Sequence, residues 1–391
     1  MTIIAEIGTA HAGSLDKACA LIDAAADAGA DCVKFQWVYA DEILHPDTGF
    51  VTLPGGAVRL YDRFKELEVD ASFFASCLDY AHRKGLLFAC SPFGLRSLLE
   101  LAALYPDAIK IASPEVNHTP LLEACAAYYG KIPIILSSGV SRLGDIENAV
   151  DLLEGDCGEA GRSGGKASEV LPVGAAALPP LTLLHCITSY PAPEREYNVR
   201  CVDTLRRVFG VPTGISDHSL DPVLIPVLTT AMGGVMIEKH ITLSRKTDGL
   251  DDPVALEPEQ FAQMVQAVHQ TQAIIRKCEK DGTSQAALPE VLRQMNEQYG
   301  CDTVEAALGS GVKRLAASER ANYGRTNRSL HYLRAMKKGE RIGEADVSIL
   351  RTEKILTPGI SPEYVRLLTG CVLARDVAAG AGVDWNDLLT R

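Results

Sequence analysis

The sequence predicts an α/β protein: a (β/α)8 barrel followed by a small β-rich domain. Two observations support this prediction. First, short apolar runs alternate with helical patterns eight times from the first residue onward, and the eight units take about 278 residues, which suits such a barrel. Second, about the last 65 residues have a different sequence pattern, in which short β-like runs are separated by glycine- and proline-containing turns.

The eight strand-like runs are short, apolar and bounded by turn residues. They lie at 3–8, 32–36, 86–91, 108–112, 132–137, 181–186, 211–216 and 235–242. The helical patterns lie at 15–28, 71–84, 95–104, 121–129, 143–153, 199–209, 222–232 and 258–278. An open, doubly wound sheet is the alternative. The eight repeated units, and the lack of a Gly-x-Gly-x-x-Gly turn after the first strand, favour the barrel.

The domain boundaries follow from these patterns. We expect a barrel over residues 1–279, a linker over 280–325 and the β-rich domain over 326–391. The linker contains an amphipathic helical pattern at about 287–299, followed by a polar run. Residues 155–180 are rich in Gly, Ala and Ser, which predicts a surface excursion before the sixth strand.

Composition restricts the classes of partner and compartment. The formal net charge of −12 argues against nucleic acid or an anionic membrane surface as the main partner, so an anionic substrate would need a local basic pocket. No apolar run approaches the length of a membrane span and the N-terminus lacks a basic region, so we expect a cytoplasmic protein. The eleven cysteines form no CxxC pair, which favours buried free thiols over a metal or disulfide framework.

Polar side chains stand at or just beyond the end of every predicted strand. In a barrel of this type the active site lies at the C-terminal ends of the strands. In strand order these side chains are Glu6; Lys34 and Gln36; Ser91; Lys110, Ser113 and Glu115; Ser137 and Ser138; Thr188 and Tyr190; Ser216, Asp217 and His218; and Glu238, Lys239 and His240. We therefore expect them to converge on one pocket.

Two lysines stand inside apolar strand runs, as Val-Lys-Phe at Lys34 and Ile-Lys-Ile at Lys110. A buried ammonium group is costly unless an anion meets it. One interpretation is an internal ion pair, with Glu6 as an obvious partner. We favour a second interpretation, in which the two ammonium groups and nearby serine hydroxyls bind a phosphate and a carboxylate.

Two histidines, His218 and His240, follow adjacent predicted strands that are separated by one helix length. Neutral imidazole is a good ligand for Mn, Zn or Fe-type ions. Either histidine alone is more simply a packed residue, but the pair, with acidic residues nearby in the pattern, predicts a divalent metal with open positions for substrate. Asp251 lies in an acidic turn after the last strand; it either faces the mouth and binds a polyhydroxy substrate or is solvated.

Taken jointly and in order, several of these segments resemble the sialic acid synthase family. The matching motifs in the barrel are Ala5-Glu6-Ile7-Gly8 with His11 and Gly13, Gly29-Ala30-Asp31-Cys32-Val33-Lys34-Phe35-Gln36, Ile109-Lys110-Ile111-Ala112-Ser113-Pro114-Glu115, His185-Cys186 with Tyr190-Pro191-Ala192-Pro193, Ser216-Asp217-His218-Ser219 and Glu238-Lys239-His240. The tail resembles that family's antifreeze-like (SAF) domain through Arg328-Ser329-Leu330, Lys338-Gly339-Glu340 and Pro358-Gly359-Ile360. The resemblance covers nearly the whole chain.

The resemblance implies a condensation of phosphoenolpyruvate with the open-chain aldehyde of an N-acyl hexosamine such as N-acetylmannosamine, giving a nonulosonic acid and phosphate. The implied phosphoenolpyruvate contacts are Lys34, Ser91, Lys110, Ser113, Ser138 (or Ser137), Thr188 and Ser216. The implied sugar contacts are Gln36, Tyr190, Glu238, Asp251 and Arg328.

The resemblance also implies a cofactor and a partner. His218 and His240 would hold a divalent metal, with Mn expected and Mg, Co or Zn as alternatives, and Glu6 and Glu115 would transfer protons or position water. A domain-swapped homodimer is implied, in which the tail of one subunit covers the partner's barrel, so that Arg328 would reach across the interface.

The chain departs from the family pattern at several positions around the expected sugar site. Ala10-His11-Ala12-Gly13 stands in place of Asn-His-Asn-Gly, and Pro92-Phe93-Gly94 in place of Pro-Phe-Asp. Later departures are at Leu250, Asp252, Ala255, Asn327 and Thr357. Two other functions therefore stay open: a metal-dependent aldolase or lyase on the same barrel, and a non-catalytic carbohydrate-binding relative.

Overall fold

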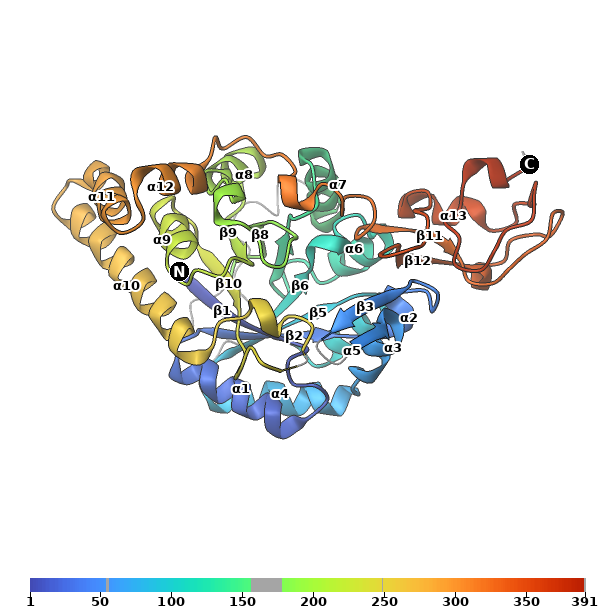
Figure 1. Ribbon diagram of the computed structural model, residues 1–391, viewed down its shortest axis with the longest axis horizontal. Coiled ribbons are helices and arrows are strands. Elements are labelled where there is room, and N and C mark those ends of the chain that lie inside the picture. The colour runs from blue at the N-terminus through green and yellow to red at the C-terminus, as the bar shows by residue number, and fades with distance from the viewer. Residues whose placement is uncertain (54–55, 156–177, 248, 390–391) are drawn as a thin grey trace.

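Eight parallel strands form a closed barrel at the centre of the molecule (Figure 1). The computed structural model describes residues 1–53, 56–155, 178–247 and 249–389. Neighbouring strands follow the order β1-β10-β9-β8-β7-β6-β5-β2 around the barrel. They are β1 (Thr2–Gly8), β2 (Cys32–Trp37), β5 (Leu87–Pro92), β6 (Ala108–Ile111), β7 (Ile134–Ser137), β8 (Leu181–Cys186), β9 (Thr213–Asp217) and β10 (Met236–His240). The predicted barrel is confirmed.

Helices on the outside of the barrel connect the strands. They are α1 (Leu15–Asp27), α4 (Ala71–Arg83), α5 (Leu95–Ala103), α6 (Thr119–Ala126), α7 (Leu143–Glu154), α8 (Cys201–Phe209), α9 (Leu224–Ala231) and α10 (Pro258–Lys280). Local sequence sets several of their ends. The Ser14 side chain accepts a hydrogen bond from Lys17 N at the start of α1, and Asp70 does the same for Phe73 N at the start of α4. Gly210, at φ 69°, ends α8 in the left-handed conformation that glycine adopts without strain.

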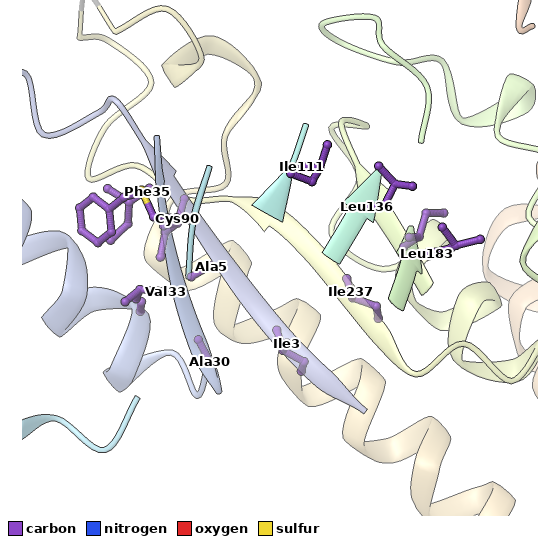
Figure 2. Packing of buried hydrophobic residues seen from close by; sticks show 14 of the residues in the cluster. Ile3, Ala5, Ala30, Val33, Phe35, Cys90, Ile111, Leu136, Leu183 and Ile237 are labelled. Atoms are coloured by element: carbon purple, nitrogen blue, oxygen red, sulfur yellow. The ribbon is translucent and has the colours of Figure 1, made fainter. Parts of the chain in front are cut away.

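Side chains alternate between the inner and outer face of each barrel strand, and the barrel therefore has two apolar cores. Side chains that face outward pack against the helices and form the larger core, part of which Figure 2 shows. Labelled members of this core are Ile3, Ala5, Ala30, Val33, Phe35, Cys90, Ile111, Leu136, Leu183 and Ile237. Side chains of opposite parity form a smaller apolar layer inside the barrel. This layer consists of Ile4, Cys32, Ala89, Ala108, Ile135, Leu184 and Met236. It closes the interior beneath the C-terminal ends of the strands.

An excursion between β2 and α4 was not predicted from the sequence. It contains α2 (Ala40–Ile43), the antiparallel hairpin of β3 (Phe50–Leu53) and β4 (Gly56–Arg59), and α3 (Leu60–Glu66). Its apolar side chains form a small separate core with Phe93 and Val38 beside the mouth of the barrel. The predicted surface excursion at 155–180 falls mostly on residues 156–177, which lie outside the described residues.

The segment after α10 packs on the barrel. Its helices are α11 (Ala287–Tyr299), which matches the predicted amphipathic pattern, and α12 (Cys301–Leu308). Val291, Met295, Val304 and Leu308 are buried members of the large barrel core. These helices therefore extend the core of the barrel, and they lie at the end of the molecule opposite the C-terminal domain (Figure 1).

The C-terminal domain has a core of its own. Its regular elements are the antiparallel pair β11 (Arg328–Tyr332) and β12 (Val347–Arg351) and the short helix α13 (Val365–Leu368). Leu330, Tyr332, Met336 and Leu373 are fully or almost fully buried at its centre. The predicted small β-rich domain is confirmed.

A buried ion pair attaches this domain to the barrel of the same chain. Glu115, just after β6, accepts hydrogen bonds from Arg328 Nε and from Arg351 Nη2 (2.6 Å). Arg328 also donates to the carbonyl oxygens of Phe93 (2.7 Å) and Glu42 (2.5 Å). Burial raises the pKa of Glu115, but the two guanidinium groups lower it by more, and the net pKa lies below the usual value. The pair therefore stays charged in the interior.

None of the described helices has the length and apolarity needed to cross a membrane. The cysteines in the described part of the chain are free thiols, as the sequence predicted.

Glycine at position 214 is required by the close approach of two barrel strands. A Cβ there would overlap the backbone carbonyl oxygen of Met236 on β10, whereas a Cβ on Gly144 of α7 would meet nothing within 4 Å. We predict that Gly214→Ala lowers the free energy of unfolding by about 1–3 kcal/mol because a backbone group has to move. Gly144→Ala, the matched control, should leave it unchanged or raise it by up to about 1 kcal/mol. Urea denaturation measures both; equal stability of the two variants would contradict this account.

Candidate active site

One layer of side chains inside the barrel carries most of the polar groups. It lies two residues beyond the apolar interior layer on each strand, so the same parity directs it to the barrel axis. Its members are Glu6, Lys34, Ser91, Lys110, Ser137, Cys186, Ser216 and Glu238, and all eight line one pocket. At least one polar side chain predicted at the end of every strand therefore lines this pocket, although not every predicted side chain does.

Two ammonium groups and two carboxylates share this layer. Lys34 Nζ lies 2.7 Å from Glu6 Oε2 and 3.8 Å from Glu238 Oε2. Lys110 Nζ lies 3.8 Å from Glu238 Oε1, which also accepts a hydrogen bond from Ser216 Oγ at 2.8 Å. The ion pair of Lys34 with Glu6 thus forms, and it forms inside the pocket, so the two interpretations of these lysines are not exclusive.

The pKa values of the two carboxyl groups in this layer are shifted in opposite directions, because the two groups have different numbers of ammonium groups beside them. Burial raises the pKa of Glu6, and the ammonium of Lys34 offsets only part of that rise. The pKa of Glu238 is lowered, because Lys110 and Lys34 together outweigh the effect of burial. Burial, reinforced by the charge of Lys34, lowers the pKa of Lys110. Glu6 is therefore the carboxyl group best suited to hold a proton, and Lys110 is the ammonium group that gains most from an incoming anion.

The rim of the pocket carries both predicted metal residues, two of the predicted sugar residues and one residue predicted to contact phosphoenolpyruvate. Gln36, Thr188, Tyr190, His218 and His240 all line it. Gln36 Nε2 donates to Glu6 Oε1 at 2.8 Å. The Tyr190 ring stacks on His218 with 4.2 Å between ring centroids. Thr188 Oγ1 has no hydrogen-bond partner among the described residues, and neither does Ser137 Oγ in the layer below. Buried hydroxyl groups without partners are open to a ligand.

The two histidines fit a metal in their donor chemistry. The centroids of the His218 and His240 rings lie 5.5 Å apart. His218 Nδ1 lies 2.8 Å from the carbonyl oxygen of Ile187, so Nδ1 carries a proton and the lone pair of Nε2 is directed elsewhere. Burial, followed by the charge of His218, lowers the pKa of His240 well below its usual value, so this imidazole is neutral.

Other features limit the metal site. Burial lowers the pKa of His218, but Cys186, whose Sγ lies 3.8 Å from Nδ1, the carbonyl group of Ile187 and the charge of Glu238 together outweigh burial. The pKa of His218 is raised to about 9, so a metal at Nε2 would replace a proton. Among the described residues no group of three or more His, Cys, Asp or Glu side chains is arranged to hold a metal. A metal here would therefore take further ligands from water or substrate. Asp251 Oδ2, 3.9 Å from His240 Nδ1, is the nearest acidic group of the turn after β10.

Four predicted site residues are placed outside the lining of this pocket, and one of them is Asp251 in the turn after β10, whose Oδ2 lies 3.9 Å from His240 Nδ1. Ser138 faces away from the barrel axis and its hydroxyl donates to the carbonyl oxygen of Leu184 at 3.1 Å, so Ser137 is the serine of β7 that lines the pocket. Glu115 is bound by two arginines in the contact between the domains. Arg328 is fully buried in that same contact, within one chain.

Some lining residues were not predicted to belong to the site. Cys186, interpreted from the sequence only as a buried thiol, lies in the polar layer, and Phe93, Ala112 and Pro114 complete the wall. The signal for Cys186 was available, because it stands two residues beyond the inward-facing Leu184. Lys239 and Asp217, which also stand at strand ends, form a buried ion pair of 2.7 Å with the opposite parity and do not line the pocket.

The departure at Gly94 has a structural compensation. Gly94 precedes α5, the position where an aspartate would cap the helix. In this chain the Glu42 carboxylate, from α2, accepts hydrogen bonds from Arg96 N (2.7 Å) and Ser97 N (3.3 Å). A Cβ on Gly94 would overlap that carboxyl group. The carboxylate that caps α5 therefore belongs to the excursion and not to the loop after β5.

Comparison with known proteins agrees with this architecture. Residues 21–280 match the NeuB family and residues 327–389 match the SAF domain. Spore coat polysaccharide biosynthesis protein SpsE of Bacillus subtilis (strain 168) is 31% identical over 392 residues, covering 100% of this chain and 94% of that protein. Its crystal structure aligns with a TM-score of 0.76 at 30% identity, over 100% of this chain and 95% of that chain.

Two further relatives carry names that describe an activity. N,N'-diacetyllegionaminic acid synthase of Legionella pneumophila is 28% identical over 99% of this chain and 94% of its own length. Pseudaminic acid synthase of Campylobacter jejuni is 27% identical over 98% of this chain and 96% of its own length. The fold and the pocket define a barrel synthase of the transferase type with a C-terminal SAF domain. The chain belongs to the NeuB family.

The relation between Glu42 and Gly94 can be tested by a double-mutant cycle. We predict that Gly94→Asp lowers the free energy of unfolding by about 1–3 kcal/mol, because the new carboxylate is forced against that of Glu42. Glu42→Ala should cost about 1 kcal/mol through loss of the cap. The double variant should be at least about 1 kcal/mol more stable than the sum of the two changes, since the introduced aspartate then caps α5 itself. Additive effects in chemical denaturation would show that the two positions do not exchange roles.

Proposed function

We propose that this protein condenses phosphoenolpyruvate with the open-chain aldehyde of an N-acyl hexosamine, such as N-acetylmannosamine, to give a nonulosonic acid and phosphate. The observation that carries the proposal is the single barrel layer in which two lysines, three serines and two carboxylates meet in one pocket. Membership of the NeuB family, with relatives named as legionaminic and pseudaminic acid synthases, supports the reaction class.

The donor is assigned to the polar layer and the hydroxyl groups next to it. Lys34 and Lys110 supply positive charge to the phosphate and carboxylate of phosphoenolpyruvate, and they act in a site where water does not screen them. The hydroxyl groups of Ser91, Ser113, Ser137, Thr188 and Ser216 complete the anion site, with Ser137 taking the place first assigned to Ser138. An anion held by these groups would loosen the contacts of the lysines with Glu6 and Glu238.

The acceptor sugar is assigned to the rim. Gln36 and Tyr190 line the mouth, and Asp251 stands beside His240. Glu238 is the charged group through which donor and acceptor sites meet, since it contacts both lysines of the layer. Arg328 is left out of the sugar site of its own chain because its guanidinium group is bound to Glu115. A homodimer with exchanged C-terminal domains stays a prediction.

His218 and His240 are assigned to a divalent metal, which we propose to be Mn. When bound, such an ion would supply Lewis-acid polarisation of the aldehyde oxygen. The pocket holds the two substrates so that C3 of phosphoenolpyruvate forms a bond with the aldehyde carbon, which leaves positive charge at C2. The aldehyde oxygen takes up a proton and becomes a hydroxyl group. Water adds at C2 and gives up its protons, and cleavage of the C2–O bond releases phosphate and leaves a ketone at C2. Glu6, whose pKa burial raises, is the group that we assign to proton exchange with this water.

The proposal predicts release of phosphate from phosphoenolpyruvate that requires both an aldose and a divalent metal. Lys110→Met should lower kcat/KM by about 100-fold or more, because the variant removes a preorganised charge from the anion site. The control Lys131→Met removes a lysine whose Nζ donates only to the carbonyl oxygen of Ala127 on the surface, and it should leave the rate unchanged. A panel of N-acyl hexosamines and their 6-phosphates would identify the acceptor. Absence of phosphate release with every acceptor would contradict the proposal, and turnover of a carbonyl substrate without phosphoenolpyruvate would indicate an aldolase or lyase.

A further inference from the structure

The chain between α12 and β11, residues 309–327, lies against the loops that follow β7 and β8. We call it the connecting segment; it contains a single turn of 3-10 helix at Ala317–Glu319. Figure 1 shows it in orange, running from α12 past α7 to β11. It overlaps the second part of residues 280–325, which were expected from the sequence to be a linker. Its side chains instead bind backbone groups of both loops. The pocket hydroxyl groups of Ser137, the last residue of β7, and of Thr188, in the loop after β8, stand beside or within these loops.

Glu319 is the central residue of these contacts. It is fully buried, and its Oε2 accepts hydrogen bonds from Val140 N and Thr188 N, each at 3.0 Å. Its Oε1 accepts from Ala316 N at 3.1 Å. A buried carboxylate is costly unless its oxygens are satisfied, and bonds from backbone N–H groups to a charged acceptor are stronger than neutral ones. The carboxylate therefore ties the loop after β7 to the loop after β8.

Other side chains of the connecting segment bind the carbonyl groups of the same loops. Lys313 is buried and its Nζ donates to the carbonyl oxygen of Ser138 at 2.8 Å. Asn322 Nδ2 donates to the carbonyl oxygen of Thr188, and Asn327 Nδ2 to that of Val140, each at 3.2 Å. Val140 and Thr188 are thus held at both their N–H and their carbonyl groups.

The loop after β7 also holds a strained conformation. Val140 is β-branched and buried, and its φ is +41°, a region that such residues rarely adopt. Strain of this kind persists only where the surroundings enforce it, and it is concentrated at functional sites. Gly139 beside it leaves no space for a side chain, because a Cβ would overlap Thr188 Oγ1 and crowd Ser113 Oγ. The hydroxyl groups of Ser113, Ser137 and Thr188 therefore depend on one backbone arrangement.

We infer that Glu319 and Lys313 are positioning residues for the donor anion site. Neither residue lines the pocket. They act by fixing the backbone that presents Ser137 and Thr188, whose hydroxyl oxygens have no partner among the described residues. The connecting segment leads directly into β11, so the same residues join the C-terminal domain to the donor site. This inference rests on the proposed use of phosphoenolpyruvate.

The test compares Glu319→Ala and Glu319→Gln with the matched control Glu196→Ala. Glu196 also accepts a hydrogen bond from the connecting segment, from Ser318 N at 2.9 Å, but it does not contact Val140 or Thr188. Glu319→Ala should raise the KM for phosphoenolpyruvate about tenfold or more, because small displacements of positioned groups weaken a site strongly. The KM for the acceptor should change less than about twofold. Glu319→Gln should be intermediate, since its amide oxygen can still accept from both loops.

Amide hydrogen exchange gives a readout that does not require activity. Exchange at Val140 and Thr188 should become faster in both Glu319 variants and stay unchanged in Glu196→Ala. If Glu319→Ala does not fold, the inference is tested with Glu319→Gln alone. This variant should raise the KM for phosphoenolpyruvate at least about threefold. An unchanged KM for phosphoenolpyruvate, or equal rises in both KM values, would overturn the inference.

Failure of the proposed function can be recognised separately. If the wild-type protein releases no phosphate with any acceptor, the condensation is wrong, and calorimetric binding of phosphoenolpyruvate then replaces KM as the measure. Weaker binding in Glu319→Ala would still support the positioning role. Equal binding in the wild type and the variant would overturn that role while leaving a donor site in place.

Discussion

Charge pairing inside the barrel is the constraint on which the site depends. Lys34, Lys110, Glu6 and Glu238 are all buried in one layer above an apolar floor. None of the four could be placed there alone, because an unpaired buried charge is far more costly than a pair. The layer is therefore a single electrostatic unit, and its unequal pairing leaves Lys110 the least satisfied member. An anionic ligand would complete this unit, so a protein of net charge −12 still offers a local basic site to an anion.

Side chains along a strand point alternately to its two faces, and this alternation determined how much of the site could be predicted from the sequence. All eight barrel strands were predicted from apolar runs, and their polar ends gave Lys34, Lys110 and both histidines. Parity would also have separated Ser137 from Ser138, but the sequence does not show which register faces inward until the strand bounds are known. Arg328 could not be placed, since its contact with Glu115 joins two domains and depends on their docking. The hairpin of β3 and β4 was not predicted, because it is an insertion in the regular alternation of strands and helices.

The domains of this chain are joined by backbone recognition as much as by side-chain packing. Arg328 donates to carbonyl oxygens of the excursion and of the loop after β5, and Glu319 accepts from the loops after β7 and β8. Loops at the mouth of a barrel carry function and have few contacts of their own. Fixed partners from the C-terminal half of the chain therefore supply rigidity that the loops lack, at positions that tolerate changes in the loop side chains.

That arrangement bears on how departures from the family pattern should be interpreted. At Gly94 the aspartate of the family pattern is absent, and the carboxylate that binds the start of α5 is that of Glu42, 52 residues earlier in the chain. A departure from the family pattern of this kind leaves the hydrogen bonds at the start of the helix in place, with a different side chain as the acceptor. Ala12, at φ +49°, has no such replacement: it adopts a conformation in which asparagine or glycine is less strained, with no compensating contact from its short side chain. Ala12 is exposed and does not line the described pocket, so the strain at this position is a local cost of the loop after β1, and it gives no structural ground for a change in what the pocket binds.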